Sequence, residues 1–296
     1  MVLSCTVVKL LHLTKFFKHR KETFQKLIIM LYLIGLGLGQ PDDITVEGLE
    51  IVKSADLVYL EHYTSTLSHG KETLEKFYGR EIILAKGEIT EQKSEEFIEP
   101  AKEKNIALLV IGDPFDDTTH YKLVLNAVKM NVAYKIVHNA SIELAVGCCG
   151  LQLYNFGGTV SIKFWDNTSK PESFFDKIEA NLKLGKHTLC LLDMKLKEQS
   201  IENLTKGNNI FEPPRYMSVE CAASQLLEIV ENRNGKSVFT KDTTCVGLAR
   251  VGCNDQKIVT KSLSEIGDCD LGAPLHTMIV CGELNALEKE FLQLFM

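Results

Sequence analysis

Short apolar runs alternate with amphipathic stretches along the chain from Met30 onward. Ile106–Ile111 is apolar at every position, as expected for a parallel strand that is covered on both faces. Such runs separated by helical patterns predict α/β units. In the first half the expected strands are Met30–Ile34, Leu57–Leu60, Glu81–Leu84, Ile106–Ile111 and Tyr134–Val137, and the expected helices are Val46–Ser54 (with Thr45 as N-cap), Lys71–Tyr78, Lys93–Lys104 and Lys122–Lys129.

The second half shows a related but distinct pattern. Its strands are longer and alternate more between apolar and polar residues, which favours a mixed sheet. Ser218 is a predicted N-cap, and Asn285 with Glu288 three residues later resembles a capping box. The expected strands are Thr159–Phe164, Thr188–Leu192, Thr244–Val251 and Leu275–Cys281, and the expected helices are Glu172–Leu184, Val219–Asn232 and Ala286–Phe295.

The length of 296 residues exceeds what one hydrophobic core usually serves, so two α/β domains are expected. We place the boundary near Asn139–Ser141, which gives an N-terminal α/β domain over residues 30–139 and a C-terminal α/β domain over residues 140–296. Residues 1–29 carry six Lys or Arg against one Glu. We interpret them as a basic N-terminal extension without a function of its own.

Charge and cysteine content narrow the class of protein. The net charge is −6, and the part of the chain after the basic extension is more acidic still, which disfavours nucleic acid as a partner. No uncharged apolar run reaches the roughly 18 residues of a membrane span, so a soluble protein is expected. Nine cysteines, an odd number without C-x-x-C spacing, predict reduced, mostly buried thiols in a cytoplasmic protein.

A glycine loop follows the first expected strand. Gly35, Gly37 and Gly39 alternate there, and glycine lets the backbone turn sharply and approach a ligand closely. With Glu61 ending the next strand, the loop permits a dinucleotide site and hence an NAD(P)-dependent oxidoreductase. Against this, the spacing is G-x-G-x-G and residues 40–43 intervene before the helix, so a tight turn is a second interpretation.

A second candidate site lies at the carboxyl end of the buried strand, in Gly112–Asp116. Open α/β sheets bind ligands at this edge, and Asp113 supplies an acceptor for a ligand hydroxyl or amine. An ordinary strand-to-loop corner is the alternative. Cys148 and Cys149 are possible nucleophiles, but buried structural cysteines are the favoured interpretation.

The motifs in combination resemble the diphthine synthases, the methyltransferases of diphthamide biosynthesis, which are tetrapyrrole-methylase-like proteins. The resemblance covers essentially Met30 to the C-terminus. It implies two α/β domains of the class III S-adenosylmethionine (SAM) methyltransferase type, a ligand in the cleft between the domains, and a homodimer. The motifs that carry it are Leu33–Gly39, Gly112–Phe115, His138–Ile142, Gly147–Phe156, Glu212–Met217, Gly247–Gly252 and Leu271–His276.

The resemblance also implies the cofactor site. Asp116 departs from the family, which usually has glycine there, so the site is expected to be more acidic and more crowded. The glycine loop is expected to face substrate and cofactor, and Glu61 thereby loses its ribose role. The implied cofactor contacts are Leu38, Asp113, Asp116, Ser141, Ile142, Leu192, Val251 and His276.

The implied substrate is a modified histidine of translation elongation factor 2. Its amine would be trimethylated and its carboxylate esterified, with S-adenosylhomocysteine as the other product. Methyl transfer needs no metal, and no His/Cys/Asp spacing suggests one. The catalytic residues stay unassigned: His120 is either a base for the amine proton or a packed loop histidine, and Arg215 either pairs with a substrate carboxylate or forms a surface salt bridge.

Two further functions stay open at this stage. A tetrapyrrole methylase acting on a small macrocycle would share the fold. A protein of the same fold could also bind the translation machinery without turning over a substrate.

Overall fold

The computed structural model describes residues 29–61, 70–85, 94–116, 118–166, 168–196, 198, 205 and 211–296. The expected basic extension therefore lies outside the described residues except for Ile29. The described chain divides into two compact units. The first contains residues 29–37 and Pro41–Asn139, and the second contains Leu38–Gln40 and Ala140–Met296. The short Leu38–Gln40 segment thus packs with residues that follow it by more than a hundred positions.

The first unit is built on a parallel sheet with the strand order β3-β2-β4-β1-β5 among the described residues. The central strand β4 is buried at all five positions, as its uniformly apolar sequence predicts. Each predicted strand is present within two residues of its expected bounds. The strands are β1 (Leu31–Gly35), β2 (Leu57–Glu61), β3 (Ile83–Ala85), β4 (Ile106–Val110) and β5 (Tyr134–Val137).

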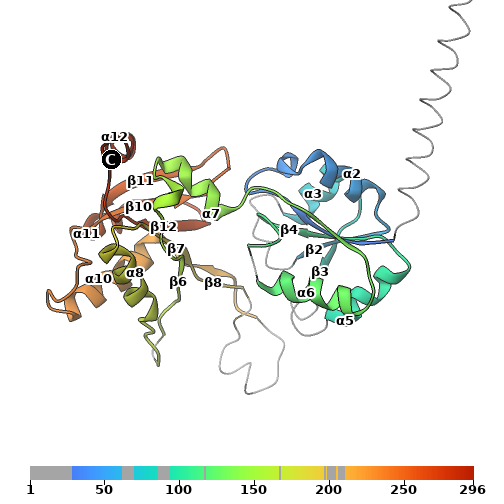
Figure 1. Cartoon of the computed structure of the whole chain (residues 1–296), viewed down its shortest axis with the longest axis horizontal. Coiled ribbons are helices and arrows are strands. Elements are labelled where there is room, and N and C mark those ends of the chain that lie inside the picture. Colours follow the sequence, from blue (N-terminus) through green and yellow to red (C-terminus); the bar gives the residue numbers. More distant parts are fainter. Residues whose placement is uncertain are drawn as a thin grey trace, which may run out of the picture. The chain divides into compact units, whose positions relative to one another are not determined.

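Helices cover both faces of this sheet: α2 and α3 lie on one face and α5 and α6 on the other (Figure 1). Thr45 caps α2 as predicted, its Oγ1 accepting from the Gly48 N–H at 3.1 Å. The single helix predicted over Lys93–Lys104 is instead two short segments, because Pro100 lacks the N–H that an α-helix needs. The helices are η1 (Pro41–Asp43), α2 (Val46–Ser54), α3 (Lys71–Tyr78), α5 (Ser94–Ile98), η3 (Glu99–Lys102) and α6 (Thr118–Lys129).

The second unit has a mixed sheet of order β11-β10-β12-β7-β6, where β6 and β7 are parallel and the other pairs antiparallel. The mixed sheet was predicted, but β11 was not. Its sequence, KIVTKS, carries two lysines, because it is an edge strand with mostly half-exposed side chains. The strands are β6 (Val160–Ile162), β7 (Thr188–Leu192), β10 (Thr244–Ala249), β11 (Lys257–Ser262) and β12 (His276–Val280), with a separate ribbon of β8 (Met194–Lys195) and β9 (Arg215–Tyr216).

Two helical layers pack on this second sheet (Figure 1). The predicted N-caps are confirmed: Ser218 Oγ accepts from the Cys221 N–H at 3.1 Å, and Asn285 and Glu288 form a capping box. The α8, α10 and α11 side is the larger apolar cluster, and η4 and α12 cover the opposite face. The helices are α7 (Ile142–Ala145), η4 (Val146–Cys149), η5 (Leu153–Asn155), α8 (Ser173–Lys183), α10 (Val219–Asn232), α11 (Leu263–Ile266), α12 (Ala286–Leu292) and η6 (Gln293–Phe295).

Within the described ranges, no helix has the length and apolarity to cross a bilayer. The cysteines of the described residues are free thiols, and those at positions 149, 190, 245 and 281 are buried.

Candidate functional site

The carboxyl edge of the first sheet is where β1 and β4 run on into glycine turns. Gly37 and Gly112 have positive φ and bridge the two turns, with the Gly112 N–H donating to the Gly37 carbonyl at 2.8 Å. A Cβ on Gly35 would lie 2.6 Å from the Gly112 carbonyl oxygen. Glycine is therefore required for this close approach of backbone. The short 3-10 helix η1 stands between the loop and α2, so no α-helix N-terminus follows the glycines directly.

Asp113 ties the ends of β4 and β5 together. Its Oδ1 accepts from the Phe115 N–H at 2.9 Å, and its Oδ2 accepts from the Asn139 N–H at 3.0 Å and from His138 Nδ1–H at 2.8 Å. Partial burial opposes ionisation, but these hydrogen bonds outweigh it and lower the pKa of Asp113. The carboxylate is therefore ionised at neutral pH and organises the loop around it.

Asn139 is a further member of this edge that was not predicted from the sequence. Its Nδ2 donates to the Gly35 carbonyl at 2.9 Å and to the Asp43 carbonyl at 3.0 Å. Asn139 follows β5 in the chain, so its side-chain amide links the end of β5 to the end of β1 and to η1. The available signal was its place directly after an expected strand, in the His138–Ile142 motif.

Asp116 closes a turn on Asp113. Its N–H donates to the Asp113 carbonyl at 3.1 Å, and its Oδ2 accepts from the Asp113 N–H at 3.4 Å. A side-chain acceptor thus adds a bond that glycine could not make. Asp113 and Asp116 are brought together at the edge where a parallel sheet binds ligands.

Three candidate contacts of the second unit meet in one apolar cluster: Leu38, Ile142 and Val251. Cys253, two residues after Val251, also contacts Leu38: its Sγ lies 3.8 Å from the Leu38 carbonyl oxygen. Ser141, directly before Ile142, caps α7 by accepting from the Glu143 N–H at 3.1 Å. The structure therefore gathers four of the residues implied by the resemblance.

Leu192 and His276 lie at one edge of the second sheet. The antiparallel register pairs Thr277 with Leu191 and Ala249 with His276, so the end of β7, the start of β12 and the end of β10 are adjacent. His276 Nδ1 accepts from the Val219 N–H at 3.3 Å, and its Nε2–H points at the carbonyl oxygens of Gly272 and Ala273. Burial lowers the pKa of His276, so the ring is neutral at pH 7.

Arg250 holds the loop that leads into β12, and this role was not predicted. Its Nη1 donates to the Leu271 carbonyl at 3.0 Å, and its Nε pairs with Asp255 at 2.5 Å. The residue has a positive φ of 50°, which few non-glycine residues adopt. Its position inside the Gly247–Gly252 motif was the only signal in the sequence.

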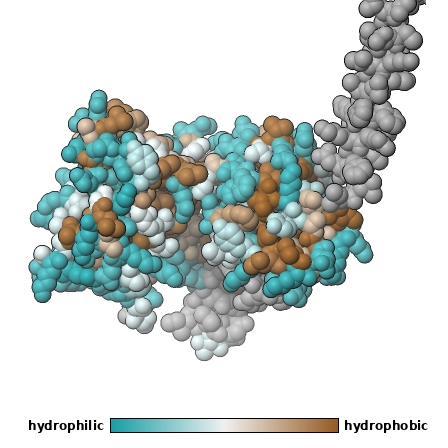
Figure 2. Space-filling view, viewed as in Figure 1, coloured by the Kyte–Doolittle hydropathy of each residue, from teal (hydrophilic) through white to brown (hydrophobic). Residues whose placement is uncertain are grey.

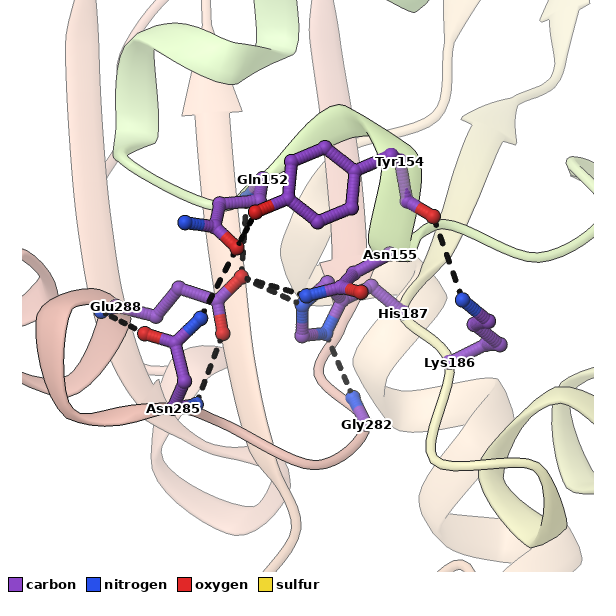
Figure 3. A network of polar contacts seen from close by, with 8 residues as sticks. All are labelled: Gln152, Tyr154, Asn155, Lys186, His187, Gly282, Asn285 and Glu288. Atoms are coloured by element: carbon purple, nitrogen blue, oxygen red, sulfur yellow. Dashed lines mark hydrogen bonds and ion pairs between the residues drawn. The ribbon is translucent and has the colours of Figure 1, made fainter.

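The motif Gly147–Phe156 is held by a buried carboxylate on α12 (Figure 3). Glu288 Oε1 accepts from the Gln152 N–H at 3.0 Å and from His187 Nε2–H at 3.2 Å. Its Oε2 accepts from the Asn285 N–H at 3.0 Å. The Gly282 N–H donates to His187 Nδ1 at 3.0 Å, so Nε2 is the ring nitrogen that donates to the carboxylate. Glu288 thus connects the Gly147–Phe156 motif to α12 and to His187.

The remaining chemical candidates have local roles. Burial raises the pKa of Cys149 to about 11 and also raises the pKa of Cys148, so both are thiols at neutral pH rather than nucleophiles. Arg215 Nη2 donates to Glu198 at 2.6 Å, the surface salt bridge that was one of its two interpretations. Among the described residues no group of three or more His, Cys, Asp or Glu lies close enough to hold a metal ion.

The chain thus joins a parallel sheet with a glycine-rich carboxyl edge to a mixed second sheet, which makes it a two-unit α/β protein. The family model for Tetrapyrrole (Corrin/Porphyrin) Methylases matches residues 30–267. The chain belongs to this family and is a methyltransferase.

Within the family, the relatives are diphthine methyl ester synthases. The Homo sapiens protein of that name is 57% identical over 270 residues, which cover 90% of this chain and 95% of the relative. The Dictyostelium discoideum protein is 49% identical over 269 residues, covering 90% and 98%. A crystal structure of diphthine synthase has a TM-score of 0.76 and 32% identity, and covers 90% of this chain and 95% of its own. This chain therefore falls in the diphthine methyl ester synthase branch, and the resemblance of its motifs is confirmed.

Proposed function

We propose that the protein transfers methyl groups from SAM to the modified histidine of translation elongation factor 2 in diphthamide biosynthesis. The reaction would trimethylate the amine and esterify the carboxylate, with S-adenosylhomocysteine as the second product. The observation that carries this proposal is 57% identity to diphthine methyl ester synthases across 90% of the chain. The family match does not support the NAD(P)-dependent oxidoreductase, and these relatives favour a diphthine substrate over a small macrocycle.

The residues present fit such a cofactor. Gly35 and Gly37 are buried where the turns after β1 and β4 pack closely. Beside these turns, backbone N–H groups hold the Asp113 carboxylate, an acceptor for a ligand hydroxyl or amine. Both ring nitrogens of His276 are engaged, so its contribution would come from its main chain. The proposed contacts are Leu38, Asp113 and Asp116 together with Ser141, Ile142, Leu192, Val251 and His276.

In methyl transfer, the main task of the protein would be to align the nucleophile with the methyl group. SAM, when bound, supplies a methyl group on a sulfonium whose leaving group is already activated. The protein would hold the nucleophile in line with that methyl, and orientation of this kind can supply roughly 7–11 kcal/mol. His120 is 1% exposed and bonded to Glu61, so its imidazole does not reach a substrate amine. We therefore assign no general base among the described residues.

We also propose a cytoplasmic homodimer. Free cysteines throughout the described ranges support a reducing compartment. Large apolar side chains are exposed along α12 and η6 and on the nearby α7 and η5, and brown residues gather over α12 in Figure 2. Such a patch favours contact with another protein surface, for which a second copy is our proposal. The exposed side chains are Leu144, Leu153, Tyr154, Leu287, Phe291, Leu294 and Met296.

Mass spectrometry of elongation factor 2 tests the function directly. The substrate would be purified from cells that lack this methylation and incubated with the enzyme and SAM. We expect four methyl groups on the modified histidine, one of which is released by mild alkali because it is an ester. S-adenosylhomocysteine in excess should suppress the reaction. An unchanged mass with an enzyme that binds SAM would instead support a non-catalytic binding protein.

A further inference from the structure

A buried imidazole–carboxylate pair lies at the carboxyl edge of the first sheet. His120 Nε2 is 3.0 Å from Glu61 Oε1, and the two side chains are 1% and 6% exposed. Glu61 is the last residue of β2, and His120 stands in the first turn of α6. The two residues are 59 positions apart in the chain, so only the folded unit brings them together.

The pair holds the far end of the loop that carries Asp113. In the sheet Leu60 of β2 is level with Leu109 of β4, so Glu61 stands beside the point where β4 ends. The β4–α6 loop is then fixed twice. Asp113 ties its start to the end of β5, and His120 ties its end to β2.

Stability alone does not account for a polar pair in this place. Removing two groups from water costs several kcal/mol, and apolar residues of similar volume often serve a core as well or better. The other inward residues of α6, Leu123, Val124 and Ala127, are all apolar and already pack it on the sheet. The hydrogen bond between Glu61 and His120 has a fixed length and direction, so it sets the position of the start of α6 relative to the end of β2.

We propose that Glu61 and His120 are positioning residues for the methyl-donor site. They hold the β4–α6 loop so that Asp113 and Asp116 stand where the cofactor binds. The inference rests on the proposed SAM contacts of those two aspartates. Neither member of the pair touches the reacting atoms, because both side chains are buried.

The double variant Glu61→Leu/His120→Leu is the main test. It removes both polar groups together, so neither is left facing an apolar replacement of the other, and we expect a thermal midpoint close to that of the wild type. We expect the dissociation constant of SAM, measured by calorimetry, and the KM for SAM to rise about tenfold or more, since small misplacements in a binding site are costly. The kcat at saturating SAM should change far less. Glu61→Gln, which keeps an acceptor for His120 Nε2–H, should restore most of the affinity.

A matched control lies further along the same helix. Asn126 Nδ2 donates to Ser94 Oγ at 2.7 Å, a part-buried polar contact between α5 and α6. Ser94→Ala/Asn126→Leu should leave SAM affinity unchanged. If Glu61→Leu/His120→Leu does not fold, Glu61→Met/His120→Met, which removes the same polar groups with more adaptable side chains, carries the same comparison.

Two outcomes would overturn the inference. One is a folded Glu61→Leu/His120→Leu variant with wild-type affinity for SAM. The other is an affinity loss of equal size in the Ser94→Ala/Asn126→Leu control, which would make the effect one of general stability. A wild-type protein that does not bind SAM would refute the proposed function instead, so the two failures are distinguishable.

Discussion

At the scale of single residues, most side chains of the candidate site form hydrogen bonds with main-chain groups and so fix the course of the loops. Asp113 accepts from main-chain N–H groups of its own loop and of β5, and Asn139 donates to carbonyls of β1 and η1. A cofactor would then meet the main chain that these bonds arrange. Residue identity matters here because each bond has a fixed length and direction.

Asp113→Ala tests this role. The substitution leaves the Phe115 and Asn139 N–H groups without their acceptor, which should cost about 1–2 kcal/mol of unfolding free energy. We expect the protein to stay folded while the dissociation constant of SAM, measured by calorimetry, rises about a hundredfold.

Asp166→Ala is the control for Asp113→Ala. Asp166 also accepts backbone N–H groups, those of Thr168 at 2.7 Å and Ser169 at 2.8 Å, but in an exposed loop of the second unit. Its removal should not alter SAM affinity. Wild-type affinity in Asp113→Ala would refute the assignment of Asp113.

At the scale of elements, helix caps and buried strands followed local sequence rules. Thr45, Ser218 and the Asn285–Glu288 box act where they were expected. Glu288 does more than cap, because it also reaches Gln152 and His187 from other parts of the second unit. Although burial opposes ionisation, hydrogen bonds from Gln152, Asn285 and His187 lower the pKa of Glu288.

Glu288→Gln should therefore destabilise the second unit. The amide turns a donor toward the Gln152 or Asn285 N–H, at a cost of about 2–4 kcal/mol at pH 7. Because the folded pKa lies below the ordinary value of 4.5, the carboxylate stabilises the fold above that pH. That contribution is lost as the pH falls through the folded pKa. The free energy of unfolding of Glu288→Gln should therefore decrease less in acid than that of the wild type.

Urea unfolding at pH 7 and at pH values below 4.5 measures both effects. Glu265→Gln is the matched control, since Glu265 forms a capping box with Ser262 at the start of α11 but is exposed. We expect Glu265→Gln to lower the free energy of unfolding by less than about 1 kcal/mol. Equal losses in the two variants would show that Glu288 acts only as a cap.

At the scale of the whole molecule, each unit has its own sheet and its own apolar clusters. Candidate contacts occur in both units, at the carboxyl edge of the first sheet and along one edge of the second. A ligand that binds the folded chain and not the unfolded one stabilises it in proportion to its affinity.

Thermal unfolding with SAM, S-adenosylhomocysteine, NAD and NADP tests the cofactor at this scale. SAM at a hundred times its dissociation constant should add about 2.7 kcal/mol to the free energy of unfolding. For units of this size that corresponds to a rise of roughly 5–10 °C in Tm. NAD and NADP should give no shift. Stabilisation by NAD without stabilisation by SAM would contradict the proposed cofactor.

Local rules predicted most of the elements, but some were hidden by their surroundings. β11 has no continuous apolar pattern because an edge strand can carry lysines. The apolar pattern over Lys93–Lys104 runs past Pro100, although that residue ends the regular α-helix. His120 and Glu61 were each singled out, yet their pairing could not be foreseen. The sequence motifs that contain Arg250 and Asn139 do not indicate what these side chains do, because their partners are main-chain atoms distant in sequence.

The amino-acid sequence by itself determined the alternation of strands and helices, the caps and the family, since these depend on periodicity, neighbouring residues and motif order. Only the tertiary structure decided which groups meet. It joined Asp113 to Asn139, Glu61 to His120, and Leu38 to Val251, contacts that the fold creates between segments distant in sequence. The physical reason is that hydrogen bonds and apolar contacts act over a few ångströms in space, whatever the separation along the chain.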